Sequence, residues 1–105
     1  ADAALRRAAR NDGWMHGGGD PEELDALLKK LAAFREEQGR TGPYQIHVIS
    51  IDAYTPDGIK RLEDKGVTDV IVGFRIPYIT GQDTESLDDK IRNLEMFAEN
   101  VIAKV

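Results

Sequence analysis

Short apolar segments alternate with amphipathic helical segments along this chain, and this alternation constrains its fold more than any other feature. The strand-like segments are residues 13–16 (GWMH), 44–51 (YQIHVISI) and 67–74 (VTDVIVGF). Helical periodicity marks residues 2–11, 20–39 and 55–66, and a last helix that starts near 83 or 84. Strand–helix alternation with short loops is typical of βαβ units with parallel strands. We therefore expect an α/β fold with about three parallel strands and four helices.

Residues 44–51 alternate at first and become continuously apolar later, which is typical of a strand that is covered on both faces, and residues 67–74 are a β-branched run that indicates a buried strand. Three strands cannot close into a barrel, and their sheet has two unpaired edges. The pattern therefore favours the C-terminal part of a larger α/β fold. In such a fold the inner face would carry some of Ile46, Val48, Val70 and Val72.

Composition excludes several functional classes. The 105 residues include 14 basic and 19 acidic side chains, a formal net charge of −5, without a basic cluster, so we expect neither a nucleic-acid nor a membrane-surface partner. The chain has no cysteine, which excludes disulfides and thiolate chemistry. It also lacks His/Glu metal spacing, a serine elbow and a Rossmann glycine pattern, so no metal site is predicted. With neither an apolar run near the ~20 residues of a membrane span nor a visible secretory signal, we expect a cytoplasmic protein.

Three consecutive glycines, at positions 17–19, stand directly before a well-marked helix start. Asp20 can cap that helix, Pro21 suits its first position, and Glu23 completes a capping-box-like spacing. Glycine loses more backbone freedom on folding than any other residue, so three in a row require a reason. Either the loop is a tight strand-to-helix turn, or bare amides and the positive helix end bind an anion such as phosphate.

Two stretches carry a family resemblance. Residues 2–31 (DAALRRAARNDGWMHGGGDPEELDALLKKL) are similar to a segment of the luciferase-like monooxygenase superfamily, which includes flavin- and deazaflavin-dependent oxidoreductases. The ending, with GVTDVIVGFRIP and ESLDDKIRNLEMFAENVI, resembles that family's last strand and closing helix. The resemblance implies a TIM-type (β/α)8 barrel, of which residues 1–105 would be the C-terminal (β/α) units. Most of the ring-binding and catalytic pocket would then lie outside these residues, and no catalytic residue is assigned.

The resemblance also implies a cofactor site. It places His16, Gly17, Gly18 and Gly19 where the family holds the phosphate of its cofactor, FMN or coenzyme F-420. Arg75, directly after the last strand, is the candidate cation for that phosphate, and its fixed charge and forked donors suit the task.

Each of these assignments has an alternative. Arg75 could instead pair with a carboxylate such as Asp83, and His16 could be structural. The acidic Asp20, Glu22 and Glu23 oppose an anion at this helix end, so phosphate binding would rest on backbone amides and a more distant cation.

Two functions follow as hypotheses. In the first, the chain is the C-terminal part of a flavin- or deazaflavin-dependent oxidoreductase or monooxygenase and contributes its cofactor-phosphate rim, while being inactive alone. Its partners would be a small-molecule cofactor and substrate, together with the N-terminal barrel portion or a second copy, which makes a homo-oligomer the expected state. In the second, it is a non-catalytic α/β module that oligomerises or binds a phosphate-bearing ligand.

Overall fold

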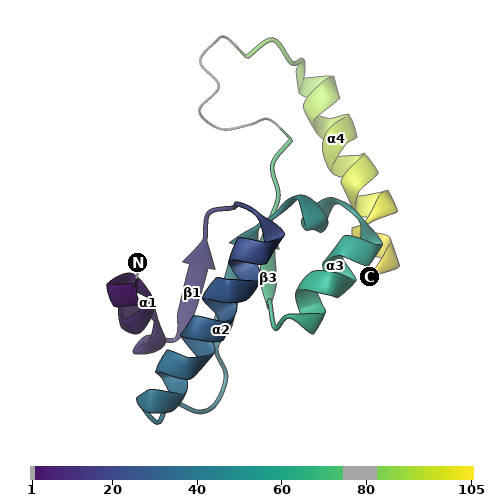
Figure 1. The fold of residues 1–105 in the computed structure, drawn as a ribbon. Coiled ribbons are helices and arrows are strands. Elements are labelled where there is room, and N and C mark those ends of the chain that lie inside the picture. The colour runs from purple at the N-terminus through teal and green to yellow at the C-terminus, as the bar shows by residue number, and fades with distance from the viewer. Residues whose placement is uncertain (1, 75–82) are drawn as a thin grey trace.

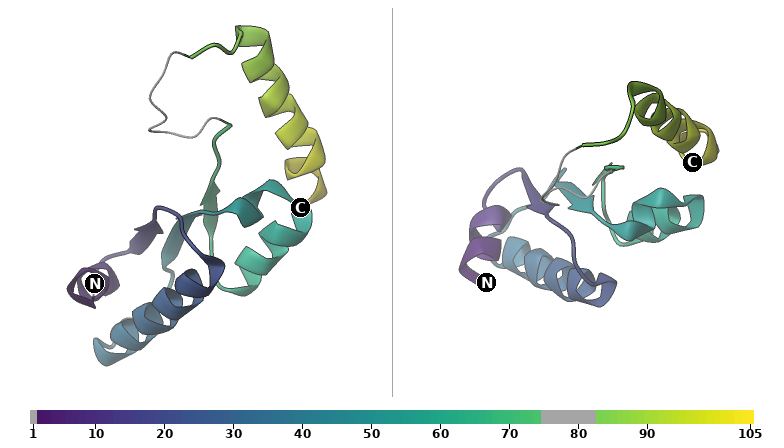
Figure 2. Two further views of the ribbon diagram at one scale, coloured as in Figure 1. Left: turned by 45° about the horizontal axis from the view of Figure 1, so that its top comes forward. Right: turned by 90° about the horizontal axis from the view of Figure 1, so that it is seen from above.

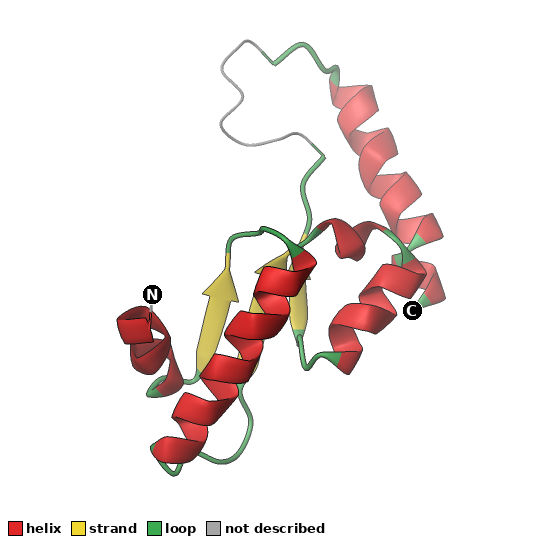
Figure 3. Cartoon of the chain, viewed as in Figure 1, coloured by secondary structure: helices red, strands yellow, loops and turns green. Residues whose placement is uncertain are grey.

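The structure, a computed structural model, describes residues 2–74 and 83–105. Within these residues it has four α-helices and three strands, which confirms the expected α/β class (Figures 1 and 3). The elements are α1 (Asp2–Ala9), β1 (Gly13–His16), α2 (Pro21–Glu37), β2 (Gln45–Ile49), α3 (Pro56–Asp64), β3 (Asp69–Ile71) and α4 (Leu87–Asn100). Two short 3₁₀ helices, η1 (Ile51–Tyr54) and η2 (Ile102–Lys104), follow β2 and α4.

The three strands form one parallel sheet in the order β1-β2-β3. In its register Trp14 lies beside Ile46, and Val48 lies between His16 and Val70. Because neighbours in register point to the same face, these five side chains share one face of the sheet.

This face is the one that helices cover (Figure 2). Val48 of β2 is fully buried and belongs to a cluster with Leu24 of α2 and Leu62 of α3. A second cluster joins α1 to α2 and the edge of the sheet through Leu5, Ala9, Leu31 and Phe34. The expectation for Ile46, Val48, Val70 and Val72 was therefore wrong: all four pack on the helix-covered side, because α2 and α3 both cross that face.

The opposite face of the sheet is open. Met15, Ile49 and Ile71 on this face are 65%, 43% and 38% exposed. Beside Met15, His47 Nε2 lies 3.2 Å from Asp69 Oδ2. Within the described residues, the strands are thus covered on one face and not on both, contrary to the expectation from the apolar later part of residues 44–51 and from the β-branched run at 67–74.

The starts of α2 and α3 follow the predicted signals, whereas the last strand is shorter and α4 starts later than predicted. Asp20 caps α2, its Oδ1 accepting a hydrogen bond from the Glu22 amide at 2.8 Å, and Thr55 caps α3. β3 covers only Asp69–Ile71, because the Val67 amide bonds back to α3 at Leu62 O instead of to a neighbouring strand. α4 starts at Leu87 and not near 83, because Ser86 provides the cap.

α4 stands away from the rest of the molecule (Figure 2). None of its 14 residues is fully buried, and its apolar stripe is largely exposed, with Leu87 at 72% and Leu94 at 60%. Its contact with the body runs through Phe97 and through Val101, which is 4% exposed. The helix therefore presents an apolar surface that the described residues leave uncovered.

Candidate functional site

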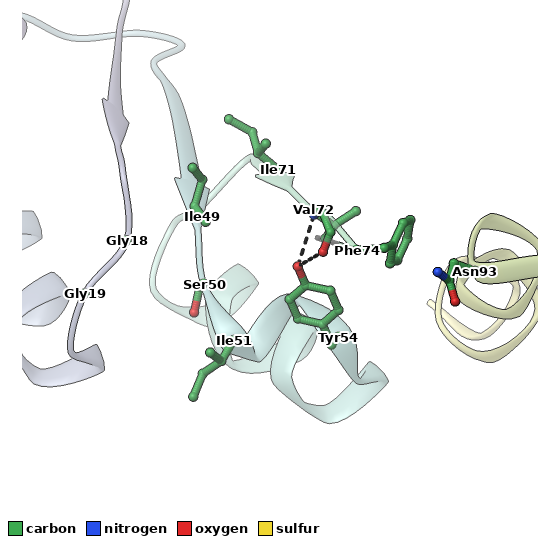
Figure 4. Close-up of a pocket in the computed structure, with 11 residues that line it drawn as sticks. Gly18, Gly19, Ile49, Ser50, Ile51, Tyr54, Ile71, Val72, Phe74 and Asn93 are labelled. Carbon is green, nitrogen blue, oxygen red and sulfur yellow. Dashed lines mark hydrogen bonds between the residues drawn. The ribbon is translucent and has the colours of Figure 1, made fainter. Parts of the chain in front are cut away.

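A cavity of about 690 Å³ lies at the carboxyl-terminal edge of the sheet (Figure 4). Residues that follow each of the three strands line it, and α4 adds one residue from the far side. The lining comprises Gly18, Gly19, Ile49, Ser50, Ile51, Tyr54, Ile71, Val72, Gly73, Phe74 and Asn93. The parallel sheet thus brings the carboxyl ends of all three strands to one site.

The cavity is largely apolar, with few polar side chains. Ile49 and Ile71 form its floor at the strand ends, and Phe74 stands on the side toward α4 (Figure 4). The Ser50 hydroxyl is already used, because it accepts a hydrogen bond from the Asp52 amide at 3.2 Å. The half-buried Asn93 makes no side-chain hydrogen bond to the described part of the chain. Such a lining suits an apolar ligand whose edge offers one or two hydrogen-bonding groups.

Two of the three glycines in the loop after β1 have a conformational reason. Gly18 and Gly19 have φ values of 113° and 130°, which side-chain-bearing residues rarely adopt. Gly17 has no such φ, and a Cβ added there would meet no atom within 4 Å. Between residues 2–74 and 83–105, the amides of Gly18 and Gly19 find no hydrogen-bond acceptor. A tight turn therefore explains why residues 18 and 19 are glycines, and it leaves the amides of both able to donate hydrogen bonds to a ligand.

Carboxylates surround the start of α2. Asp20 caps the helix, and Glu22 and Glu23 occupy its first turn. A Cβ added at Gly19 would lie 3.1 Å from the Glu23 carboxylate, so that carboxylate sits directly beside the loop. Pro21 has no N–H to offer at the first helical position. An anion here would therefore meet repulsion from three acidic side chains.

Among the described residues assigned to the cofactor phosphate, Gly18 and Gly19 line the cavity, whereas His16 and Gly17 do not. The His16 ring lies on the helix-covered face, 5.3 Å from the Trp14 ring and next to Gly19. Arg75 lies outside the described residues, so its assignment stays a prediction. Its proposed alternative partner, Asp83, forms an ion pair with Lys90 at 2.5 Å.

Sequence reasoning missed Tyr54, Phe74 and Asn93, which form one side of the cavity. Tyr54 ends η1, just after the exit of β2, and Phe74 follows β3, so their places after strand ends were the available signal. Asn93 carries no such signal, because α4 reaches the cavity only through tertiary packing.

Asp52, which follows β2, is used structurally. Its Oδ1 lies 2.9 Å from the Arg61 guanidinium, and the side chain of Asp52 is only 14% exposed. The hydrogen bond and the charge of Asp52 raise the pKa of Arg61 above its ordinary value. This pair ties η1 to α3 and so supports the segment that carries Tyr54.

Comparison with known proteins gives relatives of much greater length. Two strains of Mycobacterium tuberculosis and one of Mycobacterium bovis each have an uncharacterized protein that is 74% identical to this chain over all 105 residues. The chain spans 36% of the length of each relative. No family model matches the chain, and no solved structure matches it.

Two further features bear on the class of site. No group of three or more histidine, cysteine, aspartate or glutamate side chains in residues 2–74 and 83–105 is arranged to hold a metal ion. Of the helices in that same part of the chain, none is long and apolar enough to cross a membrane.

Proposed function

We propose that this chain is part of a flavin- or deazaflavin-dependent oxidoreductase of the luciferase-like kind, in which its carboxyl-terminal sheet edge binds part of the cofactor. The observation that carries the proposal is the apolar cavity at the carboxyl ends of three parallel strands, bordered by Gly18 and Gly19, whose amides have no acceptor among the described residues. The cofactor would supply the hydride or oxygen chemistry, while the chain supplies binding and orientation.

The arrangement of the layers supports a barrel rather than a doubly wound sheet. The strand order β1-β2-β3 follows the chain order, and α2 and α3 pack on the same face. A doubly wound sheet reverses its strand order and carries helices on both faces, whereas a (β/α)8 barrel keeps all its helices outside. In the proposed barrel the open face with Met15, Ile49 and Ile71 looks inward. Relatives almost three times as long have room for the other strands.

The character of the cavity supports a ring-bearing cofactor. Its volume of about 690 Å³ falls within the range of small-molecule sites, and its apolar strand ends suit the face of a flat ring system. In parallel sheets, ligands bind at the carboxyl ends of the strands. The site residues proposed for the cofactor phosphate remain Gly17, Gly18 and Gly19, with His16 beside them and Arg75 as the cation.

The charge around α2 limits how a phosphate can bind here. Because Asp20, Glu22 and Glu23 repel an anion, the amides of Gly18 and Gly19 must provide the contacts, and Arg75 must offset the carboxylates. We therefore expect the phosphate of FMN or coenzyme F-420 to bind more weakly here than at a site with a basic loop. High salt should weaken the binding further, because it screens the attraction to Arg75.

The experiment that tests the proposal is titration of FMN and of coenzyme F-420 into the full-length protein and two variants. Gly18→Asp places a charge and a side chain at the proposed phosphate position, and we expect the cofactor affinity to fall at least about tenfold, or roughly 1.4 kcal/mol. Gly42→Asp is the matched control, because Gly42 also has a positive φ (99°) but lies in open space in the loop before β2. Equal affinity of Gly18→Asp and wild type for both cofactors would remove this loop from the site.

A second candidate function is a non-catalytic module that associates with another protein chain. The exposed apolar stripe of α4, including Leu87 and Leu94, favours it. The titration distinguishes the two: an associating module binds neither cofactor at micromolar concentration, whereas the oxidoreductase binds one of them.

A further inference from the structure

We propose that Tyr54 is a positioning residue for the cavity: its hydroxyl fixes the backbone at Gly73 and thereby holds the wall formed by Phe74 and Asn93. This inference deepens the proposed function, because it concerns how the same cavity is shaped to receive its ligand.

The Tyr54 hydroxyl makes two hydrogen bonds to one residue. It donates to the Gly73 carbonyl oxygen at 2.6 Å and accepts from the Gly73 amide at 3.0 Å (Figure 4). A tyrosine hydroxyl can do both at once, because it has one hydrogen and free lone pairs. Gly73 lies two residues beyond the end of β3. Among the described residues Tyr54 is the partner of both backbone groups of Gly73, so it replaces the strand pairing that has ended there.

The fixed backbone leads directly to an aromatic cluster. Phe74 follows Gly73, and its ring centroid lies 5.8 Å from that of Phe97 on α4. The Tyr54 ring lies 6.2 Å from the same Phe97 ring. Both pairs meet edge to face, at 61° and 74°, which is a favourable arrangement of aromatic rings. Tyr54 thus touches the wall twice, by its hydroxyl at Gly73 and by its ring at Phe97.

The cluster also determines where Asn93 lies. Asn93 and Phe97 are four residues apart on α4 and therefore share one face of the helix. No residue of α4 itself is fully buried, so its contact with Tyr54 and Phe74 carries much of its attachment. Where Phe97 is held, Asn93 is held one turn away, with its amide toward the cavity (Figure 4).

The wall also borders a second, shallow cavity. This cavity of about 210 Å³ shares Tyr54, Phe74 and Asn93 with the first. Close packing is what normally fixes side chains in a protein interior. Because its three side chains border two cavities, the wall depends on its directional contacts, of which the two hydrogen bonds to Gly73 are the most specific.

The test compares Tyr54→Phe with Tyr44→Phe in the full-length protein. Each variant removes one hydroxyl that bonds to backbone and keeps the ring. Tyr44 donates to Ala8 O at 2.8 Å and lies before β2, at the opposite end of the strand from the cavity. In Tyr54→Phe we expect hydrogen exchange at the Gly73 amide to accelerate about tenfold or more, and the Asn93 side-chain amide resonance to shift. In Tyr44→Phe both should stay as in wild type.

Ligand binding supplies the second readout. We expect the Kd for FMN or coenzyme F-420, whichever binds wild type, to rise about fivefold or more in Tyr54→Phe and to stay unchanged in Tyr44→Phe. A third variant, Phe97→Leu, keeps the Gly73 hydrogen bonds but removes the ring contacts. It should weaken binding without accelerating exchange at Gly73, and it keeps the proposal testable if Tyr54→Phe does not fold.

The two readouts separate this inference from the proposed function. If wild type binds neither cofactor, the proposed function fails, while the exchange at Gly73 and the Asn93 resonance still decide the role of Tyr54. Unchanged exchange and an unchanged Asn93 resonance in Tyr54→Phe would overturn the positioning role. Equal loss of ligand affinity in Tyr54→Phe and Tyr44→Phe would also overturn it, because the effect would then be one of general stability.

Discussion

Gly58→Ala tests the packing that places Tyr54 at the cavity. Gly58 lies in the first turn of α3 and is buried against η1. An added Cβ would stand 2.7 Å from the carbonyl carbon of Asp52 and closer still to its oxygen. Because both atoms belong to backbone, neither can turn aside as a flexible side chain would. Carbon atoms in contact normally stay about 3.5–4.0 Å apart, so α3 and η1 must separate by roughly 1 Å.

The change in the free energy of unfolding expected for Gly58→Ala follows from two opposing effects. Overpacking against a fixed partner costs up to about 3 kcal/mol. Alanine favours a helix over glycine by about 1 kcal/mol, and this offsets part of the cost. We therefore expect Gly58→Ala to lower the free energy of unfolding by about 2 kcal/mol, a large share of the stability of a small domain.

Urea unfolding followed by far-UV circular dichroism measures this change. With a slope of roughly 1–2 kcal/mol per molar urea, the midpoint should fall by about 1–2 M. Gly17→Ala is the control, because an added Cβ there meets no atom within 4 Å, and it should stay within about 0.5 kcal/mol of wild type. A Gly58→Ala protein as stable as wild type would refute the close approach of α3 and η1.

Four further outcomes are expected. Leu62→Ala, at a side chain that is 1% exposed between α3 and the sheet, should cost about 2–5 kcal/mol of unfolding free energy in the same urea assay, and a loss below about 1 kcal/mol would contradict the core assignment. Burial raises the pKa of Tyr44 above 10.0, so the stability that this shift contributes is complete below pH 10 and is lost as pH rises through the folded pKa. Tyr44→Phe should therefore reduce the alkaline loss of thermal stability, and the same dependence of the melting temperature on pH as in wild type would contradict this. The 105-residue chain alone should show no turnover of a reduced flavin or deazaflavin, because one sheet edge cannot enclose a ring system, and any measurable turnover would count against this. Met15, Leu87 and Leu94 are 65%, 72% and 60% exposed, so the isolated chain should associate into dimers or larger species. Sedimentation at micromolar concentration measures this, and a monomer that binds no hydrophobic dye would contradict it.

The starts of α2 and α3 could be predicted because their signals are local. Asp20 before Pro21, and Thr55 before Pro56, satisfy the first amides of α2 and α3 within one turn. The parallel sheet followed from the alternation of elements. The sequence did not predict which face of each strand would be covered, because residues 48–49 and 70–72 are apolar without alternation. Val48 and Ile49 are equally apolar, yet one is fully buried and the other 43% exposed.

The candidate site was predictable only where it depends on topology. Gly18 and Gly19 follow a strand, and the exits of parallel strands meet at one edge, so their place at the cavity could be foreseen. The place of Tyr54 after a strand end was a signal, but its role could not be predicted, because that role depends on hydrogen bonds to Gly73, 19 residues away. Asn93 could not be identified either, because its place depends on how Phe97 packs against Phe74.

Nuclear magnetic resonance tests the central claim, cofactor binding at the sheet edge, most directly. Amide spectra of the full-length protein are recorded during titration with FMN and, separately, with coenzyme F-420. For one of them the account predicts saturable shifts at Gly18, Gly19, Ser50 and Gly73, while amides at the opposite end of the sheet, such as Gln45, stay in place. Shifts confined to other parts of the protein, or none with either cofactor, would contradict the account.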